Sequence, residues 1–242
     1  LSSCYFTAVL TNKSSTTALK PLTAEAHCLY KRLIVKCSGT LVESQELFNV
    51  SEEYVRRLLP LEKRMNLAGM FLGADATTGA NGYDLESKTL AASASKRIMF
   101  RPMGSAVLNI RKFWPALLLN NQGLEFTLEL APPDEALAGT VVDYELSDLR
   151  CICDQVSVTS ELQDQYLSVL LSGKSIFMNL DLTEQTQHFL PGTSAKWNIA
   201  SARQYSRLNT LVAIMQQAPG TAAETKQVNN FYIPASAKET IE

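Results

Sequence analysis

Short segments rich in β-branched and aromatic residues, separated by turn residues, run along most of this chain. In "GLEFTLEL" (123–130) apolar residues stand at every second position, with Glu125 and Glu129 between them. Successive side chains of a β-strand point to opposite faces, so this alternation predicts a strand with one buried and one solvated face. The other predicted β segments are 4–12, 28–44 with a turn at Ser38-Gly39, 96–103, 141–158, "SIFMNLDLTEQTQHFL", "AKWNIASARQYSRLNTLVAIMQ" and "QVNNFYIP". Many short strands with long connections favour an all-β fold, a β-sandwich or a jelly roll.

Two segments carry helical signals instead. In "SEEYVRRLLP" (51–60), Ser51 is placed to cap a helix whose first turn holds two glutamates, and Pro60 ends that helix or starts the next. In "SELQDQYLSVLLSG" (160–173), a capping box is followed by an apolar stripe and by Gly173 as a stop. We expect Tyr166 and Leu170 of this helix to face the core. The polar, glycine-rich stretch 73–89 predicts an exposed loop.

Composition limits the function classes. The chain has 242 residues, of which 46% are hydrophobic and 19% charged, so it can bury a substantial core. The formal net charge of −2 leaves no overall basic character to attract nucleic acid. No apolar run approaches the roughly 20 residues that a membrane-spanning helix needs.

The segment "LRCICDQVSV" (149–158) carries two thiols, Cys151 and Cys153, which would share one side of a strand. A structural zinc site requires four ligands, usually with C-x2-C or wider spacing, which this pair lacks. Free cysteine is also among the most buried residue types, so we interpret the pair as core residues of a strand. The odd total of five cysteines indicates reduced thiols and an intracellular, reducing compartment.

Catalytic signatures are absent from the sequence. Neither His27 nor His188 stands in a metal or nucleophile motif, and there is no GxSxG, HExxH, GxGxxG or phosphate-binding loop. "LSGKS" (171–175) follows a helix rather than preceding one, so it reads as a helix end. We therefore predict no catalytic residue, no metal and no cofactor.

Several weak motifs nevertheless follow one another in a definite order. They are "LYKRLIVKCSGTLVES", "LLPLEKRMN", "LEFTLELA", "YELSDLRCICDQVSVTSELQDQYLSVLLSGKSI", "ARQYSRLNTLVAIM" and "VNNFYIP". In this order, over about residues 5–234, they resemble the double jelly-roll major capsid proteins of polinton-like viruses and related small DNA viruses.

The resemblance lies in four stretches. A strand with Arg-hydrophobic-x-hydrophobic, a glycine turn and a Val-Glu pair before a helical excursion is matched by Arg32, Leu33, Val35, Gly39, Val42 and Glu43. The Cys-Asp-x-Val strand and the helix ending Leu-Leu-x-Gly-Lys are matched by Cys153, Asp154, Val156, Leu170, Leu171, Gly173 and Lys174. The Ala-Arg-x-x-Ser-Arg-Leu segment is matched by Ala202, Arg203, Ser206, Arg207 and Leu208. The final Asn-x-Phe-Tyr-x-Pro is similar to 230–234, without the intervening residue.

The resemblance implies a domain organisation. Residues 1–159 would form the first jelly roll with a helical insertion at 51–68, residues 160–173 a connector helix, and residues 174–242 the start of a second jelly roll. Proteins of this family are much longer, and the chain resembles their middle, without the earliest strands of the first jelly roll. We expect such a segment to expose unpaired strand edges and therefore to aggregate or to need a partner strand.

The resemblance also implies a function, that of a non-enzymatic major capsid protein subunit. Such subunits form homotrimers of pseudo-hexagonal outline that tile an icosahedral DNA-virus shell, so the chain would be made in a host cell and reside in the virion. Its partners would be itself and neighbouring capsomers, with penton and minor capsid proteins as further candidates and no sequence-specific nucleic acid. The structural and interface candidates are Arg32, Gly39, Glu43, Arg64, Asp154, Tyr166, Leu170, Gly173, Arg203 and Arg207.

Two other functions stay open. A β-sandwich binding module for carbohydrate or protein would use loops at one end of the fold, although no Asp-rich calcium loop is present. A hydrolase would need a carboxylate pair, and nothing selects two of the 24 acidic residues.

Overall fold

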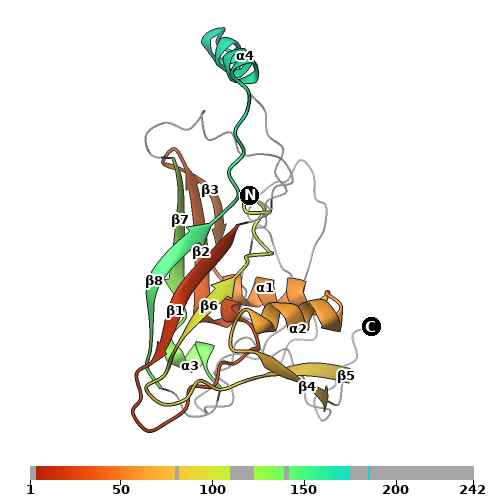
Figure 1. Ribbon diagram of the computed structural model, residues 1–242, viewed down its shortest axis with the longest axis vertical. Coiled ribbons are helices and arrows are strands. Elements are labelled where there is room, and N and C mark those ends of the chain that lie inside the picture. The colour runs from red at the N-terminus through yellow and green to blue at the C-terminus, as the bar shows by residue number, and fades with distance from the viewer. Residues whose placement is uncertain (1–3, 80–81, 110–122, 139–141, 175–184, 186–242) are drawn as a thin grey trace, which may run out of the picture.

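The computed structural model describes residues 4–79, 82–109, 123–138, 142–174 and Gln185 (Figure 1). Two three-stranded antiparallel sheets form what we call the two-sheet body. The sheet of order β6-β1-β8 consists of β1 Tyr5–Asn12, β6 Ser95–Phe100 and β8 Tyr144–Ile152. The sheet of order β3-β2-β7 consists of β2 Tyr30–Cys37, β3 Thr40–Gln45 and β7 Leu124–Leu130. The predicted strand-rich fold is therefore confirmed, and its sheets are antiparallel.

The two sheets face each other across an apolar core. The ring of Phe6 in β1 lies 5.8 Å from that of Phe126 in the opposite sheet, and 6.4 Å from that of Phe100 in its own sheet. Tyr30 of β2 stacks on Phe100 at 5.2 Å, which is a second link between the sheets. The alternation predicted for β7 is confirmed, because its glutamates are exposed and Phe126 packs against the core.

The predicted turn at Ser38-Gly39 is also confirmed. These residues have φ values of 49° and 81° and connect β2 directly to β3, where Cys37 pairs with Thr40. A two-residue hairpin turn with both φ values positive matches the right-handed twist of its strands. Glycine adopts this conformation without the penalty that a Cβ atom imposes.

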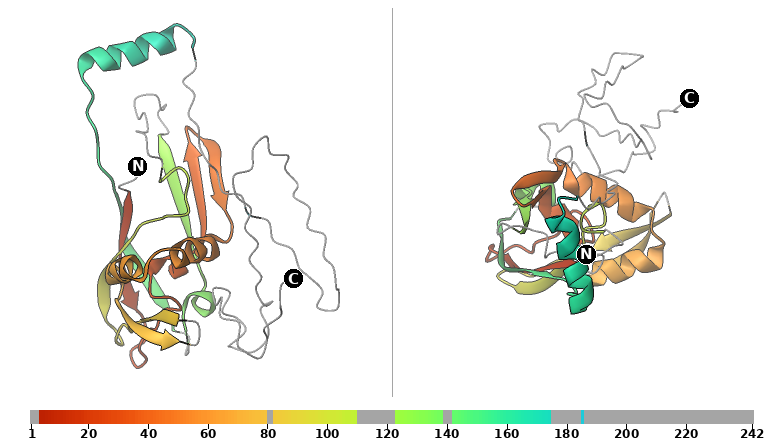
Figure 2. Two further views of the ribbon diagram at one scale, coloured as in Figure 1. Left: turned by 90° about the vertical axis from the view of Figure 1, so that its right-hand side faces the viewer. Right: turned by 90° about the horizontal axis from the view of Figure 1, so that it is seen from above.

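Two helices, α1 Phe48–Arg57 and α2 Leu61–Gly69, lie on one side of the body (Figures 1 and 2). The other helices are η1 Ala26–Leu29, α3 Pro133–Ala136 and, separate from the body, α4 Ser160–Leu171. The α1 helix packs against η1 and β2. The prediction that Ser51 caps this helix is wrong, because α1 begins three residues earlier at Phe48. Phe48 is fully buried, so tertiary packing extends the helix beyond the local capping signal.

The predicted loop at 73–89 is a β-hairpin instead. Strands β4 (Ala74–Gly79) and β5 (Gly82–Ser87) pair in antiparallel register from Ala74↔Ser87 to Gly79↔Gly82. Ala74 is buried against Ala24 and Ala68 of α2, and this packing fixes one end of the hairpin. Small polar residues have low strand propensity, but pairing and packing override it here.

The core interpretation of Cys151 and Cys153 is wrong, because both residues are exposed. β8 is the last strand of its sheet, and a bulge at Asp148, with φ of 49°, interrupts its pairing with β1. The strand ends at Ile152, so Cys153 lies beyond it.

The α4 helix stands apart from the two-sheet body, at the end of an extended segment that follows β8 (Figures 1 and 2). Tyr166 is 40% exposed, so the prediction that it faces the core is wrong. An apolar stripe shows that a helix face favours burial but does not show what buries it. The side chain of Leu170 lies outside the described residues, as does the expected second jelly roll, apart from Lys174 and Gln185.

Candidate functional site

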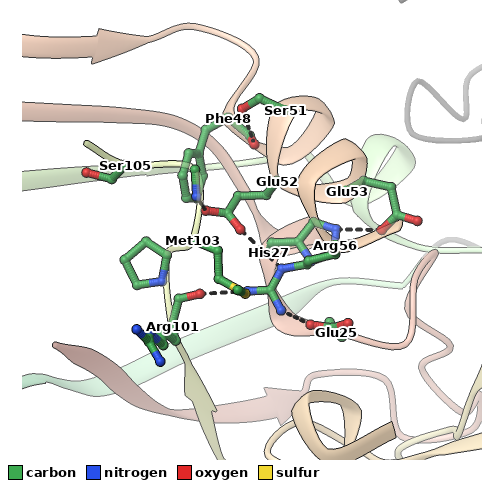
Figure 3. Close-up of polar contacts among 12 residues, drawn as sticks. Glu25, His27, Phe48, Ser51, Glu52, Glu53, Arg56, Arg101, Met103 and Ser105 are labelled. Carbon is green, nitrogen blue, oxygen red and sulfur yellow. Dashed lines mark hydrogen bonds and ion pairs between the residues drawn. The ribbon is translucent and has the colours of Figure 1, made fainter. Parts of the chain in front are cut away.

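The main concentration of buried charge in the described residues lies where α1 meets η1 and the segment after β6 (Figure 3). We call its five residues, Glu25, His27, Glu52, Glu53 and Arg56, the α1 charge cluster. Glu52 and Arg56 are four residues apart and therefore lie on one face of the helix. Glu25 and His27 come from the chain just before and within η1, so the cluster ties two distant parts of the sequence together.

Arg56 is the centre of the cluster and is only 2% exposed. Its guanidinium forms ion pairs with the carboxylates of Glu25 and Glu52, the latter with Nε 3.1 Å from Oε2. Its Nη2 donates to the carbonyl oxygen of Arg101 at 2.6 Å, and its Cζ lies 5.7 Å from the centre of the Phe100 ring. Burial and the charge of Arg101 lower the pKa of Arg56 to about 9, which still leaves it cationic at neutral pH.

Glu52 connects the helix to the segment after β6. Its Oε1 accepts a hydrogen bond from the backbone N–H of Gly104 at 2.6 Å. A Cβ atom on Gly104 would lie 3.3 Å from the same oxygen, so glycine permits this close approach. Burial raises the pKa of Glu52, while hydrogen bonds from the backbone of Gly104 and Met103 oppose the shift.

The pKa of Glu53 is shifted in the opposite direction to that of Glu52. Its Oε2 lies 2.9 Å from Nε2 of His27, and its Oε1 accepts a hydrogen bond from Nε of Arg57 at 2.7 Å. Burial alone would raise the pKa of Glu53, but the contact with His27 and the charge of Arg57 outweigh it and lower the pKa to about 2. Two adjacent glutamates therefore have pKa values shifted in opposite directions.

A second buried carboxylate, Glu43 of β3, organises the segment 105–107. It accepts hydrogen bonds from the Ser105 hydroxyl at 2.7 Å and from the backbone N–H groups of Ala106 at 3.1 Å and Val107 at 3.3 Å. Gln45 donates to Glu43 at 2.7 Å and to the carbonyl oxygen of Gly104 at 2.9 Å. The segment after β6 is thus held at two places, by Glu43 at 105–107 and by the α1 charge cluster at Arg101 and Gly104.

Opposed pKa shifts in neighbouring carboxylates are typical of acid–base sites, but they also occur in structural ion-pair networks. In this cluster the carboxylates are buried and already occupied by protein donors. An open hollow at the surface beside α2 is lined by Tyr5, Leu59, Lys63, Asn66, Leu67, Met70, Arg101 and Met103, none of which belongs to the cluster. The arrangement favours a structural role, that of fixing the helices and the 101–109 segment on the two-sheet body.

The candidate residues at the start of the chain lie at separate places. Arg32 on β2 forms an ion pair with Glu46 at 2.7 Å, Gly39 lies in the hairpin turn and Arg64 is half-buried on α2. Of this group, Glu43 alone belongs to a buried network. The structure therefore does not bring these residues together into one site.

The remaining candidates lie beyond β8 and do not meet the first group. Asp154 is exposed, Tyr166 lies on α4 and Gly173, with φ of 73°, follows the end of that helix as predicted. Leu170 belongs to α4, but its side chain, like residues Arg203, Arg207 and His188, falls outside the described part of the chain. What the sequence predicts for Leu170, Arg203, Arg207 and His188 therefore stays a prediction.

The sequence did not identify Glu25, Glu52 and Arg56 as members of a buried charge cluster. The Glu-x3-Arg spacing in "SEEYVRR" was visible, but such pairs usually lie on solvated helix faces. This pair is buried by contacts with residues far away in the sequence: Glu25 pairs with Arg56 across 31 positions, and Gly104 donates to Glu52 across 52 positions.

Within the described ranges, no three His, Cys, Asp or Glu side chains gather closely enough to hold a metal ion. Among the same residues, no helix has both the length and the apolar character needed to cross a membrane. No protein-family model matches the chain, and no curated protein sequence matches it.

Proposed function

We propose that this chain is a structural subunit of a viral shell, of the double jelly-roll type, which acts through shape and self-association rather than catalysis. The proposal rests on the ordered motifs that resemble the major capsid proteins of polinton-like viruses. In this proposal the two-sheet body is part of a jelly-roll β-sandwich. The chain is made in the reducing interior of a host cell and then resides in the virion.

The structural observation that supports self-association most is the exposed apolar surface of α4. Five large apolar side chains of this helix are at least 37% exposed, namely Leu162, Tyr166, Leu167, Val169 and Leu171. Leu149 and Ile152 at the end of β8 are also more than half exposed. Leu162, Tyr166 and Val169 are three and four residues apart and therefore lie on one face of the helix, and monomeric soluble proteins rarely leave such an apolar face exposed, whereas subunits of assemblies cover it on association.

The geometry of the proposed assembly follows from symmetry. In the family that the motifs resemble, two similar sandwiches in each full-length chain and three chains in each capsomer would give an approximately six-fold outline from three-fold symmetry. A net charge of only −2 is compatible with close lateral packing of identical subunits, because strong like charge would oppose it.

Electron microscopy of the purified chain tests the proposal directly. Negatively stained particles with three-fold symmetry and a near-hexagonal outline are the expected result. Uniform particles of single-chain size at micromolar concentration would contradict it.

The alternative, a binding module for carbohydrate or protein, is favoured by one feature, the hollow beside α2. Tyr5, Lys63, Asn66 and Arg101 give it an aromatic ring and polar groups that could bind hydroxyl or carboxylate groups. Saturable binding of a glycan by a monomer, lost in Lys63→Ala, would favour this alternative over a shell subunit.

A further inference from the structure

Two thiols meet at the end of the β1–β8 ladder. The Sγ atoms of Cys4 and Cys151 lie 3.4 Å apart, although 147 positions separate the residues in the sequence. β1 and β8 are hydrogen-bonded neighbours, with Tyr5 opposite Ile152 and Phe6 opposite Cys151. In this register Cys4 and Cys151 are diagonal neighbours, and a disulfide requires about 2.05 Å between the sulfur atoms, so the two sulfurs must approach by about 1.4 Å to form one.

The two thiols differ in accessibility. Cys4 is buried, whereas Cys151 is exposed. The hydrogen bond from Cys4 lowers the pKa of Cys151 to about 7, although partial burial opposes the shift, and it raises the pKa of Cys4. An oxidant in solution can therefore reach a reactive sulfur at Cys151, with a second thiol directly behind it.

We propose that Cys4 and Cys151 form a reversible disulfide site, oxidised by low-molecular-weight disulfides such as oxidised glutathione. The Cys151 thiolate attacks one sulfur of oxidised glutathione, breaks its S–S bond and releases one glutathione thiolate. Cys4 then loses its proton to water and attacks the Cys151 sulfur of the mixed disulfide, which releases the second glutathione thiolate. The protein pair is oxidised by two electrons, and oxidised glutathione is reduced to two glutathione thiols.

The site lies where a cross-link has a local effect. β8 ends at Ile152, one residue after Cys151, and the chain then leaves the body towards α4 (Figure 1). A bond from Cys151 to Cys4, the residue before β1, would hold the last residues of β8 in the sheet and fix the base of the segment that carries α4. Reducing compartments would keep the pair as thiols, and oxidising surroundings would convert it to the disulfide.

The test uses the full chain, oxidised glutathione and a matched set of single variants. After oxidation and alkylation, free thiols are counted in denaturant and cross-linked peptides are identified by mass spectrometry under non-reducing conditions. We expect the five thiols of the sequence to fall to three, with Cys4 joined to Cys151. Cys151→Ser should abolish this intramolecular cross-link, whereas Cys37→Ser and Cys153→Ser should preserve it. Dithiothreitol should restore all the thiols.

The pH dependence of the reaction provides a second readout. With the pKa of Cys151 at about 7, the rate of the first step should rise about tenfold between pH 6 and pH 8, against roughly a hundredfold for a thiol with a pKa near 9. Hydrogen exchange at residues 150–152 should also slow on oxidation in the wild type but not in Cys151→Ser. A cross-link from Cys4 to Cys153 instead, or five free thiols after oxidation, would overturn the proposal.

Discussion

Replacing Arg56 by methionine tests whether the α1 charge cluster stabilises the fold. Methionine keeps much of the aliphatic volume of arginine but removes the charge and its donors. Glu25 and Glu52 would then remain buried without their cation, and the carbonyl of Arg101 would lose its donor. Breaking a buried ion pair from one side typically costs about 3–5 kcal/mol in the free energy of unfolding.

Arg57→Met is the matched control on the same helix. Its side chain is 42% exposed, and it pairs with Glu53 at 2.7 Å in the same i,i+4 geometry that Arg56 has with Glu52. Arg57 is partly in solvent and its buried partner Glu53 keeps the contact with His27, so losing this cation should cost about 1 kcal/mol, close to the upper value for surface pairs. Urea unfolding at pH 7, followed by tryptophan fluorescence and circular dichroism, should therefore show a difference of roughly 2–4 kcal/mol between the two variants.

The loss of unfolding free energy caused by Arg56→Met should also depend on pH. Burial raises the pKa of Glu52 to about 8 in the wild type, and loss of the cation raises it further, so above pH 8 the folded variant keeps a proton that the wild type releases. The destabilisation should accordingly be larger at pH 9 than at pH 7. If Arg56→Met and Arg57→Met agree within about 1 kcal/mol at pH 7, the cluster does not stabilise the fold as argued.

Three further predictions follow from the geometry. Glu43→Gln should cost about 1–3 kcal/mol in urea unfolding, because its amide NH2 would face N–H donors, whereas Gln in place of the exposed Glu46 should have little effect. The folded-state pKa of Glu53 lies below its unfolded value of about 4.5, so its stabilising contribution is present above pH 4.5 and is lost as the pH falls towards 2; Glu53→Gln should flatten the unfolding free energy over that window. Leu162→Ser and Tyr166→Ser should change the unfolding free energy by less than about 0.5 kcal/mol, because both side chains are exposed, but should weaken self-association measured by sedimentation velocity. Equal association of these variants and the wild type would exclude α4 from the interface.

The strands could be predicted from the sequence because their signals are local. Alternation of apolar and polar residues located β7, and the Ser38-Gly39 pair located the turn between β2 and β3. The hairpin β4–β5 was missed because its residues have low strand propensity and are held by pairing with each other and by contacts with Ala24 and Ala68.

The buried charges could not be predicted in the same way. A glutamate and an arginine one turn apart fit a solvated helix face as well as a buried one, and the choice depends on residues far away in the sequence. Burial of Glu52 and Arg56 depends on their contacts with Glu25, Gly104 and the carbonyl of Arg101. The α4 helix shows the reverse case, because its apolar stripe suggested burial within the chain and the structure leaves it exposed.

The most direct test of the proposed function is the mass of the native chain in solution, measured by light scattering over a range of concentrations. The proposal predicts a discrete species with three times the 26.6 kDa mass of one chain. It also predicts that Tyr166→Ser shifts this species towards the monomer, whereas serine in place of Leu58, which is 68% exposed but lies outside α4, does not. A single species of one-chain mass at every concentration would contradict the account of this chain as a self-assembling shell subunit.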